Sequence, residues 1–488
     1  MRIFLSLFIF FAICVKTYAL PVDVKGRFLS DSHYLGNYRK ASVNEQTTIN
    51  SGSMIPTRNG HKDDSANFQT YLFQLQPQII INDAVSVFSE ITGGYAGGGF
   101  LGDSTRYKQS PAAGFGDALF LQNYSGPGMD NSVYFSQIYA ELYADTATIL
   151  VGKHAYNWGL GAIFNDGNVL GSRFRTIRNG FTVKFKIGNF QFEPFWDKSS
   201  MHGSLTTGST TRTWGASALY TNLEKDMVLG LMLAKRSSNI EDSFYTSANT
   251  GVALGGNDVK ILDIYVKKTW SFYTLGMEVP MISGTLGKVY TLPTATNLQN
   301  TDATYDAKAY ILQNDFKSNE FWKFILHGAL ITGNAGQGPA YKAMYLHPNF
   351  QMANILFKYN HQAITDNSQN VFDSYMTNAL VLKTGTNYSN EIWELDLFLI
   401  WAKALEAAGA NGKFYNHLQA KVYNSTIAQE KDMGMELDFN VRYNWNSNVK
   451  LYAQFGHLFT GKYFAYNIDT NANKKNEFSF LGGMGVEF

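Results

Sequence analysis

The chain has 488 residues and carries 40 Lys and Arg against 39 Asp and Glu, so its formal net charge is +1. This balance excludes the basic excess that nucleic-acid-binding proteins normally show. Charged residues make up only 16% of the chain and aromatic residues 15%, and the mean hydropathy is −0.18. These values exclude a helical membrane bundle and disfavour an ordinary soluble enzyme, whereas strands of alternating polarity average to such a hydropathy.

The N-terminus has the pattern of a secretory signal peptide. An apolar run, Ile3–Val15, follows Met1-Arg2, and Thr17-Tyr18-Ala19 offers the small residues of a cleavage site. We therefore expect a signal peptide over 1–19 and a single barrel domain over 20–488. The apolar run is too short to span a hydrocarbon core of roughly 30 Å. The one cysteine, Cys14, lies inside it, so the expected mature chain has no thiol.

Short turns and long polar stretches alternate along the rest of the chain. The predicted short turns lie near 82–83, 144–147, 188–189, 222–226, 268–270, 316–319, 386–390 and 446–447. The predicted long loops lie near 31–66, 93–131, 157–179, 199–212, 237–258, 281–305, 332–374, 403–433 and 461–476. This rhythm predicts a single transmembrane antiparallel β-barrel of about 18 strands, with about 16 as the alternative, and with short periplasmic turns and long extracellular loops.

The predicted strands alternate between an apolar face and a polar face. In 434–445, the odd-numbered positions from Met435 to Trp445 are apolar, and Glu436, Asp438 and Arg442 lie on the opposite face. A charged face costs several kcal/mol per charge near the membrane midplane, so it must point into the barrel. Trp393 and Trp401 lie on one face at a spacing of roughly 20 Å along the membrane normal, which suits two aromatic girdles.

The last strand, 478–488, has Phe or another apolar residue or Gly at every even position. The edge strand of a soluble β-sandwich is the alternative that this pattern alone leaves open. In a barrel, this strand would pair with a first strand near 22–30 and remove the free edge. Phe488 also resembles the C-terminal aromatic residue that the bacterial barrel-assembly machinery recognises, so this machinery is an expected partner during biogenesis.

Charges on the inward faces are the predicted pore lining. Their mixed but acidic-leaning balance favours a general or weakly cation-preferring pore, although each of them also suits a salt bridge within the wall. The predicted pore-lining residues are Glu141, Lys184, Lys186, Glu193, Asp197, Asp263, Lys267, Glu278, Glu394, Asp396, Glu436, Asp438 and Arg442.

A basic group, Arg173, Arg175 and Arg178, lies in the predicted loop before Lys184 and is the candidate for a substrate-facing patch. Contact with anionic lipid headgroups or sugars of lipopolysaccharide is the equal alternative. The glycine-rich run 93–99 lacks the Lys-Ser/Thr ending of a phosphate-binding loop. Since no metalloprotease, paired-cysteine or nucleophile-elbow motif occurs either, we expect no enzyme activity, cofactor or metal.

Two segments resemble the alginate-export-type family of outer-membrane channels. The first is Gly434–Tyr443, with its G-x-E-x-D pattern, followed after a turn by Leu451–Phe464; the second begins at Tyr139-Ala-Glu-Leu-Tyr143 and continues to the Trp158-Gly loop. Lys153 and Thr460 depart from the Arg and Pro that are common in the family. The resemblance implies an eighteen-stranded barrel with a transport role, without carrying over a substrate.

The leading hypothesis is a bacterial outer-membrane channel that passes small hydrophilic solutes through a water-filled lumen. An exporter of a polysaccharide within an envelope-spanning secretion machine is the alternative, although a polyanion exporter would need a basic lumen. A surface adhesin or structural barrel is a third hypothesis, and it predicts a blocked lumen.

Overall fold

A computed structural model describes residues 21–42, 64–94, 124–125, 133–200, 209–240, 258–285, 304–336, 340–361, 371–372, 374–418 and 421–488. The predicted signal peptide, 1–19, and residues 95–99 of the glycine-rich run 93–99 lie outside these residues. Among the described residues, no helix is long and apolar enough to cross a membrane.

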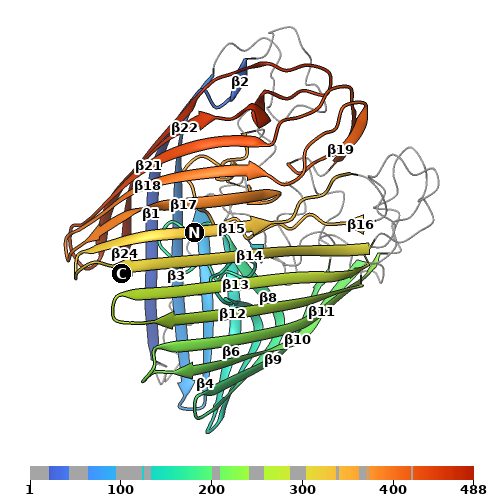
Figure 1. The fold of residues 1–488 in the computed structure, drawn as a ribbon. Helices are drawn as coiled ribbons and strands as arrows, with labels where there is room; N and C mark the ends of the chain where they lie inside the picture. The colour runs from blue at the N-terminus through green and yellow to red at the C-terminus, as the bar shows by residue number, and fades with distance from the viewer. Residues whose placement is uncertain are drawn as a thin grey trace, which may run out of the picture.

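Eighteen long antiparallel strands in the described part of the chain form one closed barrel (Figure 1). Each strand pairs with the next along the chain, and the last pairs with the first. The barrel strands are β1 (Val22–Gly36), β3 (Ser65–Asn82), β4 (Val85–Gly94), β6 (Tyr134–Ala144), β7 (Ala147–Ala155), β8 (Arg175–Ile187), β9 (Phe190–Ser200), β10 (Ser209–Asn222), β11 (Met227–Ile240), β12 (Asp258–Thr269), β13 (Tyr273–Thr285), β14 (Thr304–Lys317), β15 (Trp322–Ile331), β17 (Ala379–Ser389), β18 (Trp393–Ala404), β21 (Asp432–Asn444), β22 (Val449–Thr460) and β24 (Glu477–Glu487). The predicted fold class and the count of eighteen are confirmed, and the alternative of sixteen is wrong.

Strand β1 closes the barrel between β3 and β24. Ser30 is opposite Met484 on one side and Tyr71 on the other. Beyond the end of β24, the backbones of Gly26 and Phe488 exchange hydrogen bonds of 2.7 and 3.0 Å. The Phe488 ring lies where a Cβ at position 26 would stand, so this close approach requires glycine. The predicted pairing of the first and last strands is therefore confirmed.

The two ends of the barrel differ in their connections. Short turns join the strands at one end, called the turn end, and long connections join them at the other, called the loop end (Figure 1). The eight predicted turns all occur, and their bounds differ from the predicted ones by a few residues at most. Both described ends of the chain, near Val22 and Phe488, lie at the turn end.

Short elements lie in the long connections. β2 (Ala41–Ser42) pairs with β23 (Asn473–Lys474), and β19 (Gly412–Asn416) pairs with β20 (Lys421–Ser425). β5 (Tyr124–Ser125) pairs with β8, and β16 (Ala340–Tyr341) adds to β14 in parallel. A 3₁₀ turn, η4 (Lys462–Ala465), precedes β23. Several long connections therefore carry local structure of their own.

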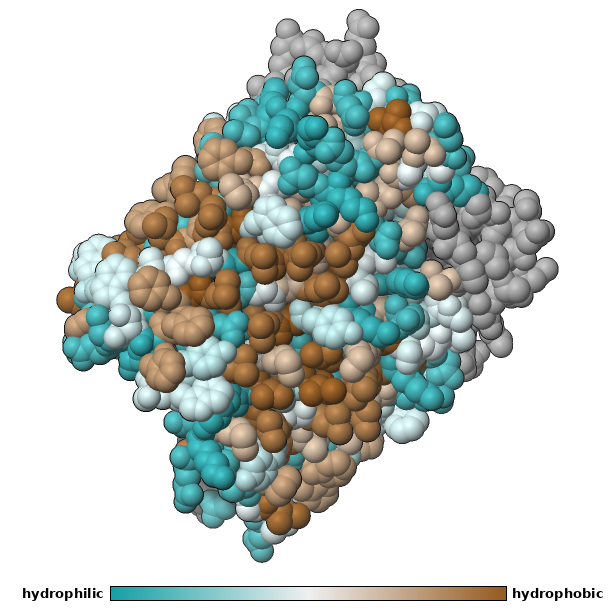
Figure 2. Space-filling model, in the orientation of Figure 1, coloured by the Kyte–Doolittle hydropathy of each residue, from teal (hydrophilic) through white to brown (hydrophobic). Residues whose placement is uncertain are grey.

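The outside of the barrel is apolar. Side chains that alternate along the strands are exposed there, and a hydrophobic band crosses the middle of the face seen in Figure 2, with more hydrophilic surface towards both ends. On β21, for example, Met435, Leu437 and Phe439 are 40 to 45% exposed, while Glu436 and Asp438 are buried. A closed barrel satisfies every ladder hydrogen bond internally and lipid covers its apolar face. The chain thus has the architecture of an integral outer-membrane barrel.

The buried core lies inside the barrel, where two connections fold back into it. Inner loop A is defined as residues 156–174, between β7 and β8, and inner loop B as the described residues of 342–378, between β15 and β17. Their buried apolar side chains pack with inward residues of the wall. The buried apolar residues of the two loops include Tyr156, Trp158, Ile163, Phe174, Met344, Leu346, Ile355, Leu356, Tyr359 and Met376.

Candidate functional site

The inner loops meet in the barrel interior. The Asn349 side chain of inner loop B donates to the carbonyl of Phe174 at 2.6 Å and to the side-chain oxygen of Asn165 at 3.2 Å, and it accepts from the Phe174 amide at 3.2 Å. The amide of His347 donates to the carbonyl of Ala162 at 2.6 Å. Inner loops A and B are therefore joined to each other as well as to the wall.

Inner loop A reaches across to the inner face of β13. The Glu278 carboxylate accepts the amide hydrogen of Leu160, and Gly159, at φ +57°, lies so close to that carboxylate that a side chain would meet it. Asp263 on β12 lies beneath the same loop, and both carboxylates are fully buried. The sequence analysis expected them to line water. They do point inward, but the backbone of loop A covers them.

Inner loop B is fastened to β21 in the same way. The two carboxylate oxygens of Glu436 accept from the amides of Ile355 and Leu356 at 2.7 and 2.9 Å, and Asp438 accepts from the amide of Asn354 at 3.1 Å. Glu436 and Asp438 are 0 and 1% exposed. They point into the barrel as expected, and backbone amides of the loop, in place of water, are their hydrogen-bond donors.

Lys358 of inner loop B brings a cation to this interior. Its Nζ donates to the Gln454 side chain of β22 at 2.7 Å. Burial lowers the pKa of Lys358 to about 8, against the raising effect of Asp438 and Asp31 nearby. At neutral pH the ammonium is therefore still charged, and it titrates just above neutrality.

A cavity of about 650 Å³ lies at the turn end of the lumen. We call it the mixed chamber, because charges of both signs line it. Two residues of the predicted pore lining, Lys184 and Glu193, are among them. The other charged residues of this chamber are Lys25, Arg27, Asp166 and Glu487.

A second cavity, of about 300 Å³, lies between the two inner loops and strands β1, β21 and β22. We call it the basic chamber, since its cationic lining residues are Arg173, Lys358 and Arg442 and its carboxylate is Asp31. Arg173 is bound to Asp31 and to the Thr70 hydroxyl. The mixed and basic chambers are thus two polar, water-accessible cavities of the described interior.

The three arginines of the predicted basic loop lie in two different elements, inner loop A and strand β8. Arg173 lies in inner loop A, as expected, and lines the basic chamber. Arg175 and Arg178 belong to β8 instead, because the strand begins at Arg175 and not after 179. Arg178 is buried between the rings of Tyr156 and Phe195, at 3.2 and 3.5 Å from their centroids. Its role is therefore packing within the wall, and the loop assignment was wrong for these two residues.

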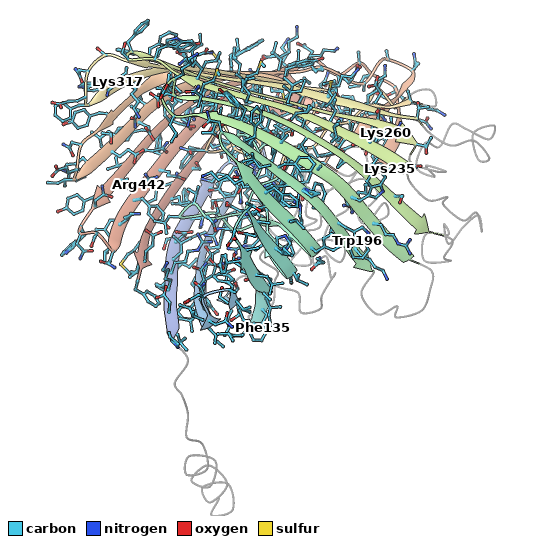
Figure 3. The ribbon with its side chains drawn as sticks, turned by 90° about the horizontal axis from the view of Figure 1, so that it is seen from below. Phe135, Trp196, Lys235, Lys260, Lys317 and Arg442 are labelled. Atoms are coloured by element: carbon cyan, nitrogen blue, oxygen red, sulfur yellow. The ribbon has the colours of Figure 1, made fainter. Side chains whose placement is uncertain are left out.

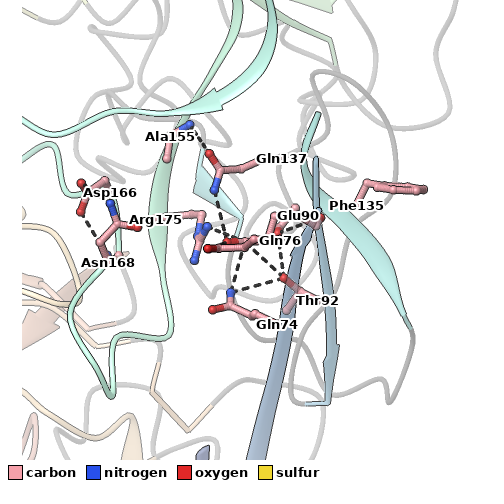
Figure 4. Close-up of polar contacts among 12 residues, drawn as sticks. Gln74, Gln76, Glu90, Thr92, Phe135, Gln137, Ala155, Asp166, Asn168 and Arg175 are labelled. Carbon is pink, nitrogen blue, oxygen red and sulfur yellow. Dashed lines mark hydrogen bonds and ion pairs between the residues drawn. The ribbon is translucent and has the colours of Figure 1, made fainter. Parts of the chain in front are cut away.

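Arg175 belongs to a buried polar network around Glu90 of β4 (Figure 4). Glu90 accepts from the Gln76 side chain at 2.6 Å and from the Gln137 side chain at 3.4 Å, as well as from Arg175 and Ser136. The pairing of β4 with β6 shifts at Glu90, and such a bulge redirects a side chain. Glu90 was not among the predicted pore-lining residues, although it lies on the same face of β4 as the inward Ser86 and Thr92.

Apart from Asp197, the remaining predicted residues lie near the turn end, where Figure 3 labels Arg442. Arg442 pairs with Glu394, and Asp396 accepts from the Asn387 side chain at 2.7 Å. Asp197 is buried near Arg178. Glu141 is half-buried, while Lys186 and Lys267 are exposed.

Several inward charges were missed by sequence reasoning. Asp31 and His33 lie on β1, which was predicted to end near residue 30, so the longer strand was the missing signal. Arg27 lies on the same face of β1 as these two residues and also points inward. Lys358 lies in a loop, where no periodicity marks direction. In the described part of the chain, no group of three or more His, Cys, Asp or Glu side chains is placed to hold a metal ion.

No protein-family model matches the chain, and no curated protein matches it either. The expected membership of the alginate-export-type family is thus not shown. Among solved structures, OpdQ of Pseudomonas aeruginosa is 9% identical, with a TM-score of 0.47 over 96% of this chain and 98% of that chain. OccK5 (OpdH) of the same organism is 10% identical, with a TM-score of 0.46 over 96% and 98%. The anion-selective porin of Comamonas acidovorans is 11% identical, with a TM-score of 0.40 over 96% and 99%. At this similarity, the fold assignment rests on the strand pairing described above.

Proposed function

We propose that the chain is a porin-like outer-membrane channel, without enzyme activity, that passes small hydrophilic solutes. The observation that carries the proposal is the mixed chamber, a charged cavity of about 650 Å³ inside a closed membrane barrel. An eighteen-stranded barrel is wide enough to enclose an aqueous lumen, and inward loops narrow such a lumen to a selective passage.

The inner loops favour small solutes over polymers. Loops A and B are hydrogen-bonded to each other and anchored on β13 and β21, so they occupy the interior that a polysaccharide strand would need. This weighs against the exporter hypothesis. The same occupied interior supports the hypothesis of a structural barrel. If the loops filled the lumen completely, the barrel would have no conductance.

Selectivity in this proposal comes from both chambers. Lys184 and Glu193 face the mixed chamber and Arg442 the basic chamber, while Glu278, Glu436 and Asp438 serve as loop anchors. The cations of the basic chamber offset the acidic residues elsewhere, so we expect weak ion selectivity. Outer-membrane lipid and lipopolysaccharide would contact the apolar exterior, and the barrel-assembly machinery would recognise the C-terminal strand.

Single-channel recording in planar bilayers tests the proposal, with reversal potentials measured in a salt gradient. We expect stable conductance with weak selectivity. Complete absence of conductance from correctly folded barrels would contradict the channel and favour a structural role. Strong anion selectivity would favour the exporter instead.

A further inference from the structure

The two chambers are separated by one stretch of inner loop A. This stretch is residues 166–172, here called the strap, and different residues of the strap line each chamber. Asp166 and Asn168 line the mixed chamber, whereas Val169, Leu170 and Ser172 line the basic chamber. The strap is thus a partition one chain thick between cavities of different charge.

The middle of the strap is held by one side chain of the barrel wall. Arg27 of β1 donates to the carbonyl of Gly167 at 2.8 Å and to the carbonyls of Asn168 and Val169 at 3.3 Å each. Arg27 is 8% exposed, and its Nε donates to Gln74, which in turn donates to Glu90 at 3.3 Å. With Gln74, the three strap carbonyls give the guanidinium four acceptors in its fixed fork, whereas a lysine ammonium has only three donors and no fork.

The ends of the strap are anchored separately. Before it, the carbonyl of Asn165 accepts from the amide of Thr176 at 2.6 Å, and after it, Arg173 is bound to Asp31. The strap itself remains open to solvent: Val169 is 68% exposed although it is apolar. Two fixed ends and an exposed middle make the Arg27 clamp the element that determines where the partition stands.

We propose that the strap divides the turn-end lumen into two parallel solute chambers, and that Arg27 is the positioning residue that keeps them apart. This inference rests on the proposed channel function. When the clamp is lost, the middle of the strap can move into either chamber, so the two cavities merge into one wider passage. The size limit for solutes then rises, independently of any change in charge.

Neutral sugars of increasing size, tested by swelling of liposomes that contain the barrel, separate size from charge. Lys462→Ala is the control, because Lys462 carries the same charge but lines neither chamber, and its ion pair at 2.9 Å is with exposed Glu430 and not with the strap. We expect Arg27→Ala to admit larger sugars than the wild type and Lys462→Ala to keep the wild-type limit. Arg27→Lys, which keeps the charge but loses the fork, should also raise the limit.

Equal size limits for Arg27→Ala, Lys462→Ala and the wild type would overturn the inference and leave the channel proposal standing. A wild-type barrel that passes neither ions nor sugars would overturn both. Migration of unheated samples in detergent gels shows whether each variant is folded. If Arg27→Ala fails to fold, the comparison of Arg27→Lys with Lys462→Ala decides, since a size limit unchanged in Arg27→Lys contradicts the clamp.

Discussion

Inner loops A and B enter the same barrel but have different surfaces. Loop B is buried almost throughout, with Ile355, Leu356 and Met376 at 0 to 1% exposure, and it lines only one chamber. Loop A combines a buried tip around Trp158 with an exposed strap that borders both chambers. The comparison indicates that loop B mainly fills one side of the lumen, whereas loop A shapes the space that solutes can use.

The largest expected effect comes from releasing loop B. Glu436→Ala removes the acceptor of two buried amides, those of Ile355 and Leu356. Each unpaired buried amide costs about 1 to 3 kcal/mol, so we expect a clear loss of stability together with larger, noisier conductance. Thermal unfolding in detergent and single-channel recording measure the two effects.

Glu436→Gln is the conservative control, because an amide side chain still offers one acceptor oxygen. It should fall between the wild type and Glu436→Ala in both measurements. Wild-type conductance and stability in Glu436→Ala would show that the loop is held elsewhere.

A smaller effect is expected when the loops are uncoupled from each other. Asn349→Ala removes the side-chain bonds to Phe174 and Asn165. We expect a loss of about 1 to 3 kcal/mol, because the side-chain hydrogen bonds that join the two loops are removed. A double-mutant cycle with Asn165→Ala measures the coupling; additive effects would mean that the loops are independent units.

The next expected effect is a change of ion selectivity with pH, caused by Lys358 in the basic chamber. The pKa of Lys358 is lowered to about 8, so its ammonium is charged at pH 7 and largely neutral at pH 9. Reversal potentials should therefore shift towards cation preference between these values. In Lys358→Met this shift should be much reduced. An equal shift in the variant would assign it to other groups.

Because its folded pKa lies below the unfolded value, Lys358 binds fewer protons in the folded state between about pH 8 and 10. Its contribution to stability therefore rises with pH across this window. The free energy of unfolding, measured for the wild type and for Lys358→Met at about pH 8 and 10, tests this. The wild type should gain stability relative to Lys358→Met as the pH rises.

The smallest effect is expected for the ion pair between Glu394 and Arg442, which is about half exposed. Glu394→Gln should change stability by only about 0.2 to 1 kcal/mol, because water screens such pairs. It should nevertheless alter selectivity, since Arg442 lines the basic chamber. Unchanged reversal potentials would place this pair away from the solute path.

The barrel was predictable from the sequence because lipid and water impose strict alternation on every strand. Met435 and Leu437 are exposed as predicted, and the turn at 188–189 lies where the polar residues placed it. The direction of Glu436 and Asp438 was also predictable. The alternation of side chains therefore predicted which face of each strand points outward and that the barrel closes, and the rhythm of turns and loops predicted the strand count.

The surroundings of those inward carboxylates were not predictable. Nothing in the local pattern near Glu436 shows that the backbone of residues 354–356, some 80 residues earlier in the chain, replaces water there. Likewise, Arg175 looks like a loop residue by position but is fixed in β8 by Glu90. Long-range packing of the inner loops decides which inward charges reach water.

Thiol modification tests the central claim most directly, because the one native cysteine lies in the predicted signal peptide. Lys184→Cys lies in the mixed chamber, whereas Ala402→Cys is fully buried and changes little volume. We predict that a small negatively charged thiol reagent reduces the single-channel conductance of Lys184→Cys and leaves Ala402→Cys unchanged. Unchanged conductance in a Lys184→Cys barrel that is shown to be modified would contradict a solute path through the mixed chamber.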